Sequence, residues 1–97
     1  MKILVFGGTG RTGQVMCRVA AGQGAEVLAP SHAACPLEDA SAVSDYVLRS
    51  GAQVVVNCAA ISGLAACGDD PLRAHLSNAV APAAMARMCR HTGARCV

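Results

Sequence analysis

The chain opens with KILVFGGTGRTG at residues 2–13, and this stretch decides the fold. Its first part, Lys2–Phe6, is a short apolar run with a β-branched residue on either side of Leu4, and glycines stop it at once. Such a run predicts a buried strand. A helical pattern starts directly after the glycines, at Arg11. The order of strand, glycine-rich turn and helix predicts an α/β unit whose turn lies at the carboxyl end of a strand.

The turn carries three glycines, Gly7, Gly10 and Gly13, in the spacing GxxGxxG. In a dinucleotide-binding turn the first permits the tight turn, the second removes a side chain where a pyrophosphate meets the backbone, and the third lets helix and strand pack closely. Because the start of a helix offers free N–H groups, we expect those of Arg11 and Thr12 to bind the phosphates. Some turns with this spacing bind nothing, and the flanking strand and helix are what favour a dinucleotide site here.

Helical and strand patterns alternate from this turn to the end of the chain. The first helix has Val15 and Val19 four residues apart, which predicts its apolar face. Three consecutive valines at residues 54–56 are typical of a strand that is covered on both sides. The elements that we expect are strand 2–6, helix 11–21, strand 26–29, a helix after Asp39 that ends at residues 50–51, strand 53–57, a helix after Asp70 that Gly93 stops, and a strand from residue 94.

The order β-α-β-α-β-α-β predicts an α/β fold, a Rossmann-type parallel sheet with helices on both faces and right-handed crossovers. A length of 97 residues allows one domain. The last expected strand begins at residue 94, and no turn follows it before Val97. We therefore expect residues 1–97 to be the front, N-terminal portion of an NAD(P)-binding Rossmann domain, cut at the start of its fourth strand.

Two aspartates and a proline predict details of the helices. Asp39 and Asp70 precede helical patterns, and Pro71 suits the first helical position after Asp70. We interpret these acids as helix caps rather than as metal ligands. Pro82 lies inside the last helix and cannot donate a hydrogen bond to the carbonyl of Asn78, so a kink or break is expected there.

The composition excludes several classes of protein. Hydrophobic residues make up 54% and charged residues 14% of the chain, which is typical of a globular domain. The net charge of +2 is not gathered in a basic run, so we expect no nucleic-acid partner. The apolar run at residues 3–6 is too short for a signal sequence or a membrane span, which predicts a cytoplasmic protein with no membrane contact. The 6 cysteines include no CxxC pair, and we interpret them as reduced thiols.

The end of the second strand indicates which dinucleotide the site prefers. A site for NAD commonly places Asp or Glu there, where the carboxylate bonds the ribose hydroxyls. Here the sequence is Pro30-Ser31-His32, with no carboxylate. Ser31, His32 or Arg11 could contact a 2′-phosphate, so the sequence favours NADP slightly over NAD. The alternative interpretation of His32 is a solvated loop residue.

Three segments carry a resemblance that covers the whole chain: KILVFGGTGRTGQ, QVVVNCAA and DDPLRAHLSNAVAPAAMARMCRHTGARCV. They resemble the extended short-chain dehydrogenase/reductase family, and within it the dTDP-4-dehydrorhamnose reductase branch. The resemblance implies that Cys58, Ala59 and Ala60, which follow Asn57, lie beside the ribose and pyrophosphate of the cofactor. It also implies that Asn78 lies near the nicotinamide.

The chain departs from the family pattern at several positions. Pro36 and Leu37 stand where the family often has an Asp and an apolar residue at the adenine, so only an apolar or main-chain contact from Leu37 is expected. Ser62 matches a position near the substrate that usually holds a hydroxyl side chain. Ala65 and Gly68 replace two acids that the reductase branch usually carries in this loop. The substrate therefore need not be the deoxy-sugar nucleotide usual in the branch.

Enzymes of this family protonate a carbonyl oxygen with a Tyr that is assisted by a Lys four residues later. The only Tyr here is Tyr46, on the apolar face of its helix with Ser50 four residues on, and the only Lys is Lys2. We therefore expect no catalytic residue and no metal ligand within this chain. The sequence predicts the cofactor-binding part of an NAD(P)-dependent reductase for a nucleotide-sugar or similar carbonyl substrate. The alternative is a non-catalytic dinucleotide-binding regulatory protein, and whether the chain forms a homo-oligomer stays open.

Overall fold

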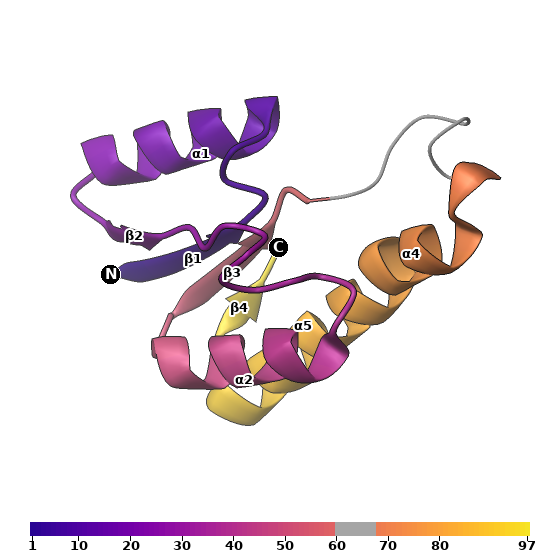
Figure 1. The fold of residues 1–97 in the computed structure, drawn as a ribbon. Helices are drawn as coiled ribbons and strands as arrows, with labels where there is room; N and C mark the ends of the chain where they lie inside the picture. The colour runs from indigo at the N-terminus through magenta and orange to yellow at the C-terminus, as the bar shows by residue number, and fades with distance from the viewer. Residues whose placement is uncertain (60–67) are drawn as a thin grey trace.

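The computed structural model describes residues 1–59 and 68–97 of the chain. Within these residues, four parallel strands form one sheet in the spatial order β2-β1-β3-β4 (Figure 1). This sheet confirms the α/β fold class that the alternation of helices and strands predicts. The strands are β1 (Lys2–Phe6), β2 (Glu26–Leu28), β3 (Val54–Asn57) and β4 (Arg95–Cys96).

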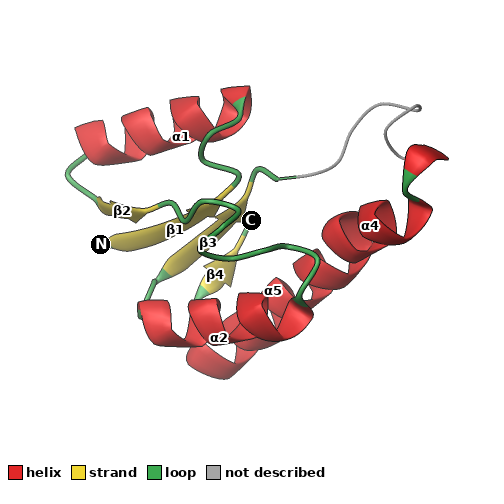
Figure 2. Ribbon diagram, viewed as in Figure 1, coloured by secondary structure: helices red, strands yellow, loops and turns green. Residues whose placement is uncertain are grey.

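Helices cover both faces of the sheet. Figure 2 shows α1 on one side of the strands and α2 and α5 together on the other. This two-sided cover is the arrangement expected of a Rossmann-type domain. In the part of the chain that is described, no helix is long and apolar enough to cross a membrane. The helices are α1 (Arg11–Gly22), α2 (Ala40–Ser50), α4 (Pro71–His75), the π-helical turn η1 (Leu76–Val80) and α5 (Ala81–Thr92).

The chain reverses its direction across the sheet at β1. Ile3 of β1 lies opposite Val27 of β2 on one side and opposite Val54 of β3 on the other. The helix that follows β1, α1, lies on one face of the sheet, whereas α5, which precedes β4, lies on the other (Figure 1). In open α/β sheets, ligands bind in the crevice that forms at such a point.

The face covered by α2 and α5 holds the hydrophobic core. Leu4 of β1, Val43 of α2 and Met85 of α5 are fully buried in one contiguous cluster. Tyr46 packs against this cluster, and its ring meets that of Phe6 edge to face with 6.4 Å between the ring centroids. Tyr46 is therefore partly buried against the core, the side on which its place on the apolar face of the helix predicts it.

The packing of α1 corrects the prediction for its apolar face. Val15 and Val19 are each 55% exposed, so they do not form the face that meets the sheet. The buried residues of α1 are Gly13 and Ala20, and Cys17 between them is half-buried. The helix α1 thus meets the sheet through its small residues, and its valines lie on another side of the helix.

Both predicted helix caps are confirmed. The Asp39 carboxylate accepts a hydrogen bond from the backbone N–H of Ala42 at 3.1 Å, at the start of α2. The Asp70 carboxylate accepts one from the backbone N–H of Arg73 at 3.0 Å, and Pro71 takes the first helical position of α4. These two aspartates thus satisfy N–H groups that have no partner within their own helices.

The distortion predicted at Pro82 takes the form of a π-helical turn. The turn η1 carries the chain from α4 into α5, and the N–H of Ala81 donates to the carbonyl of Leu76 five residues earlier. Pro82 follows directly, at the start of α5, and supplies no N–H for the carbonyl of Asn78. A wider turn at this point lets the helix continue without a break.

Candidate dinucleotide-binding site

The glycine-rich turn is pressed against the segment that follows β3. Gly7 has a φ of +77°, and a Cβ at this position would lie 2.6 Å from the backbone nitrogen of Ala59. The Asn57 side chain fixes that segment, because its Oδ1 accepts a hydrogen bond from the same nitrogen at 3.1 Å. Glycine is therefore required at Gly7 both by the left-handed backbone and by the close approach of a second backbone.

Gly13 has the packing role that the sequence predicts for the third glycine. A Cβ at this position would lie 1.9 Å from the carbonyl oxygen of Gly7 and 2.8 Å from the Cα of Gly8. Real Cβ atoms essentially never approach other heavy atoms this closely. The absence of a side chain at Gly13 thus lets the first turn of α1 rest on the turn that precedes it.

Gly10 differs from the other two glycines of the motif, because a Cβ added at this position would point into open space. Its backbone is extended (φ −76°, ψ 172°), and a Cβ would meet only the carbonyl oxygen of Gly7, at 3.5 Å. Gly10 caps α1 without a side-chain hydrogen bond, and the first helical bond is from Gln14 N to Gly10 O at 2.9 Å. By helix geometry, the N–H groups of Arg11 and Thr12 have no carbonyl partner within α1.

Two adjoining hollows, of about 170 and 230 Å³, lie at the carboxyl ends of β1 and β3. Gly7, His32, Leu37 and Ala59 line both of them, and we call the two together the cleft. The cleft lies where the strand order reverses, which is the place expected for a ligand. The smaller hollow is completed by Phe6, Gly8, Thr9, Pro30 and Cys35, and the larger by Gly10, Glu38, Cys58, Arg73 and Ser77.

The cleft brings together half of the residues that the sequence predicts for the cofactor. Leu37 comes from the loop before α2, and Cys58 and Ala59 come from the end of β3, so segments distant in sequence meet the glycine-rich turn here. Their contact with a cofactor stays a prediction. The predicted residues that line the cleft are Gly7, Gly10, Leu37, Cys58 and Ala59.

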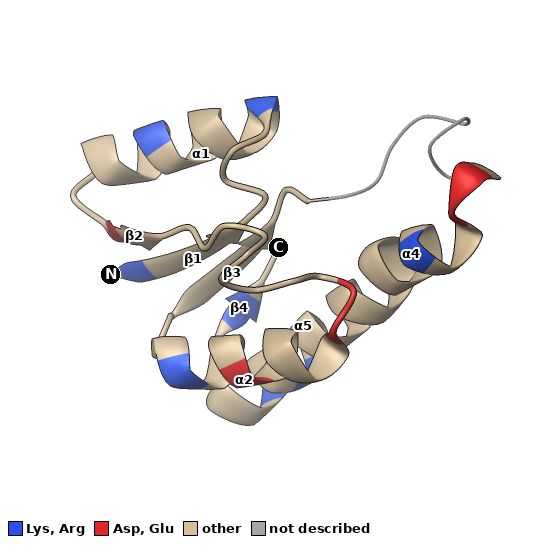
Figure 3. Ribbon diagram, in the orientation of Figure 1, with Lys and Arg blue, Asp and Glu red and all other residues tan. Residues whose placement is uncertain are grey.

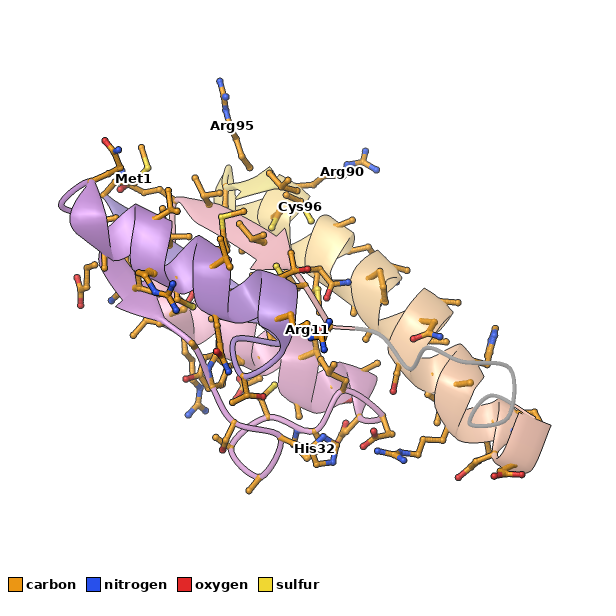
Figure 4. All side chains as sticks on the ribbon, turned by 90° about the horizontal axis from the view of Figure 1, so that it is seen from above. Met1, Arg11, His32, Arg90, Arg95 and Cys96 are labelled. Carbon is orange, nitrogen blue, oxygen red and sulfur yellow. The ribbon has the colours of Figure 1, made fainter. Side chains whose placement is uncertain are left out.

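Other predicted residues lie elsewhere. Arg11 and Thr12 line a separate groove along α1, and the contact of the Arg11 side chain with a 2′-phosphate stays a prediction. Figure 4 shows Arg11 on α1 and His32 on the loop after β2, both distant from Met1. Asn78 is exposed on η1, and its contact with the nicotinamide stays a prediction. Ala60 and Ser62 lie outside the described residues.

Sequence reasoning missed a carboxylate that lines the cleft, Glu38. Its Oε1 accepts from Arg73 Nε at 3.2 Å and from Ser77 Oγ at 3.4 Å, and its Oε2 lies 3.3 Å from His32 Nε2. In Figure 3 the acidic segment before α2 and the basic segment of α4 lie on the same side of the molecule. No sequence spacing links residues 38 and 73, and the only signal was that Glu38 directly follows Leu37.

His32 matches neither of its two interpretations fully. Its side chain is 60% exposed, as a solvated residue would be, yet it lines both hollows and pairs with Glu38. Ser31, its neighbour, accepts a hydrogen bond from the backbone N–H of Ala34 at 3.2 Å. Ser31 therefore shapes the loop in which His32 stands.

The two cysteines that line the cleft are neutral thiols near pH 7. Burial raises the pKa of Cys58 above its usual value, and the neighbouring Cys17 raises it further. Burial also raises the pKa of Cys35, with a smaller contribution from the Asp39 carboxylate. Because the thiolate is the reactive form, these cysteines act as small apolar lining rather than as nucleophiles.

The residues of the cleft fit a dinucleotide. A Cβ at Gly10 would enter open space beside the start of α1, where N–H groups have no helical partner. A guanidinium, that of Arg73, lines the same hollow. A parallel sheet with this turn and this cleft places the chain in the class of Rossmann-type α/β folds.

The chain belongs to the family described as the RmlD substrate binding domain, which it matches over residues 1–97. The dTDP-4-dehydrorhamnose reductase of Mycolicibacterium smegmatis is 38% identical over 88 residues, which are 91% of this chain and 26% of that protein.

Solved structures of reductases have the same fold. The dTDP-4-dehydrorhamnose reductase of Clostridium acetobutylicum has a TM-score of 0.90 and 27% identity, over 99% of this chain and 34% of that one. The reductase of Bacillus anthracis, solved in complex with NADP, has a TM-score of 0.86 and 16% identity, over 98% of this chain and 34% of that one. The chain thus spans about a third of the length of these solved proteins.

Proposed function

We propose that this chain is the cofactor-binding part of an NAD(P)-dependent reductase that acts on a nucleotide-linked sugar or a similar carbonyl compound. The observation that carries the proposal is the cleft at the reversal of strand order, where Gly10 presents bare backbone beside the start of α1. Membership of the RmlD substrate binding domain family and the reductases among its relatives support it.

In this proposal each part of the cleft has one task. The N–H groups of Arg11 and Thr12 bind the pyrophosphate above Gly10, and Leu37 provides the apolar contact for the adenine. Cys58 and Ala59 leave room for the ribose and pyrophosphate. Gly7 and Gly13 shape the turn on which the cofactor lies. The remaining proposed contacts are those of Ala60 with the ribose, Asn78 with the nicotinamide and Ser62 with the substrate.

The bound dinucleotide would supply a hydride to the carbonyl carbon, and this chain would bind and orient it. The chain's single Tyr, Tyr46, packs against the ring of Phe6 and does not itself line the cleft. The replacement of two acids of the reductase branch by Ala65 and Gly68 favours a second candidate function, a dinucleotide-binding regulatory protein without reduction chemistry. An assay for carbonyl-dependent oxidation of NADPH, run on the whole protein of which this chain is the proposed cofactor-binding part, separates the two, because only a reductase consumes the cofactor.

NADP is the proposed cofactor, with NAD as the alternative. The end of β2 carries no carboxylate, so nothing there would repel a 2′-phosphate. Glu38 is the carboxylate that lines the cleft, and both its oxygens already have partners in His32, Arg73 and Ser77. The proposal also includes a cytoplasmic location, since the described cysteines are free thiols.

Fluorescence titration of the purified protein with NADPH and NADH tests the proposal. We expect saturable binding of both, with the lower Kd for NADPH. ADP-ribose should compete with both, because it shares the pyrophosphate and adenosine. If neither cofactor binds at millimolar concentration, the proposal is wrong.

A further inference from the structure

The glutamate found in the cleft holds an arginine from another element. Glu38 lies in the loop before α2, and Arg73 lies in α4, 35 residues later in the chain. The Glu38 side chain is 25% exposed and the Arg73 side chain 53%. Ser77 is buried, and its hydroxyl donates to the same oxygen, Oε1, that accepts from Arg73. Glu38 thus anchors Arg73 at the rim of the larger hollow.

The contact with Glu38 uses only part of the arginine. Within the described part of the chain, the guanidinium of Arg73 bonds Glu38 through Nε alone. A guanidinium has five N–H donors, so the two terminal NH₂ groups remain for a ligand. Arg73 lines the same hollow as Gly7, Gly10 and Cys58.

A cation beside the pyrophosphate would strengthen its binding to the N–H groups at the start of α1, and Arg11 does not line the cleft. Arg11 lies along the groove of α1 with Val15 and Val19. Among the described residues that line the hollow at Gly10, the basic side chains are Arg73 and His32. Arg73 is always charged and can form charge-assisted hydrogen bonds with phosphate, which are stronger than neutral ones.

We propose that Arg73 binds the pyrophosphate of the dinucleotide and that Glu38 is the positioning residue that holds its guanidinium at the cleft. The inference rests on the proposed function and deepens it. The pyrophosphate is the chosen target because Arg73 shares its hollow with Gly10, whereas the hollow that reaches Pro30 at the end of β2 does not include Arg73.

Fluorescence titration of variants with NADPH and NADH tests this role. Arg73→Met should raise the Kd for each cofactor about tenfold, because a charged hydrogen bond to phosphate is lost. Arg73→Lys, which keeps the charge, should stay within about threefold of wild type. The loss in Arg73→Met should shrink as salt is added, because added ions screen the attraction that remains in the wild type.

A matched control is available on α2. Arg49 is also held by a carboxylate through Nε, that of Asp45 at 3.1 Å, but it lies outside the cleft lining. Arg49→Met should leave both Kd values unchanged. Because exposed ion pairs contribute little to stability, both methionine variants should keep the melting temperature of the wild type within a few degrees.

The positioning role of Glu38 is tested by coupling. In a Glu38→Gln background, Arg73→Met should raise Kd only about threefold, because the guanidinium is no longer held in place. An equal tenfold effect in both backgrounds would overturn the positioning role.

An unchanged Kd in Arg73→Met, or a loss confined to NADPH, would overturn pyrophosphate binding while the proposed function stands. If the wild type binds neither cofactor, the proposed function is wrong and the inference falls with it.

Discussion

The two faces of the sheet are packed in opposite ways. On the face of α2 and α5, large side chains such as Phe6 and Met85 fill the space and stabilise the fold by burial. On the face of α1, the contact is made by Gly13 and Ala20, and the turn before the helix tolerates no Cβ at Gly13. The first face depends on the side chains that are present, and the second depends on those that are missing. The candidate site lies where the two meet, since the glycine-rich turn before α1 lines it together with Phe6 and Leu37 of the core side.

The largest effect on stability is expected from a substitution on the α1 face. Gly13→Ala should destabilise the protein by about 4 kcal/mol, because its Cβ would collide with backbone atoms that cannot move independently. Urea unfolding measures the change. Gly22→Ala, also in α1 but with no atom near its Cβ position, is the control and should be neutral or slightly stabilising. Equal stability of the two variants would contradict the close packing of α1.

The core face should respond differently to the loss of a side chain. Met85→Ala removes a fully buried side chain and should cost about 3 kcal/mol in unfolding free energy. Since Met85 does not line the cleft, the Kd for NADPH should stay at the wild-type value wherever the variant is folded. A weakened Kd in the folded variant would show that the two faces are not independent.

A helix cap on the core side gives a smaller effect. Asp39→Ala removes the acceptor for Ala42 N–H at the start of α2 and should cost about 1 kcal/mol. Asp39→Asn keeps an oxygen acceptor and should recover most of the loss. Chemical denaturation of the wild type and of both variants measures the unfolding free energy. Equal stability of the Asp39→Ala and Asp39→Asn variants would show that the capping hydrogen bond does not stabilise α2.

The smallest effect is expected on the outer side of α1. Val19→Ser should change the unfolding free energy by no more than about 0.5 kcal/mol, because Val19 is 55% exposed. The same substitution at Val43, which is fully buried against the sheet, should be severely destabilising. Comparable losses at the two positions would mean that Val19 is covered after all.

The fold could be predicted from the sequence because its signals are local. The apolar runs of β1 and β3, the caps Asp39 and Asp70 and the glycine spacing each depend on neighbouring residues, and the structure confirms them. The prediction for Val15 and Val19 was wrong for a physical reason: apolar periodicity reports hydrophobicity, whereas α1 packs through its smallest residues. Hydrophobic spacing does not reveal how closely a helix approaches.

The candidate site could be predicted only in part. Gly7, Gly10 and Leu37 were found because motif and position identify them, and the structure brings them to one cleft. Glu38 and Arg73 were missed, because their contact depends on how α4 lies beside the loop before α2. A side-chain pair that is far apart in sequence leaves no pattern to read.

The central claim is that the open space at Gly10 receives the pyrophosphate of a dinucleotide. The most direct test is the Kd for NADPH of Gly10→Val, with Gly22→Val as control. The backbone of Gly10 is extended and its Cβ position open, so the variant should fold, losing about 1 kcal/mol from a poorer helix cap. The account predicts that Gly10→Val loses NADPH binding while Gly22→Val keeps the wild-type Kd. Wild-type affinity in a folded Gly10→Val protein would contradict it.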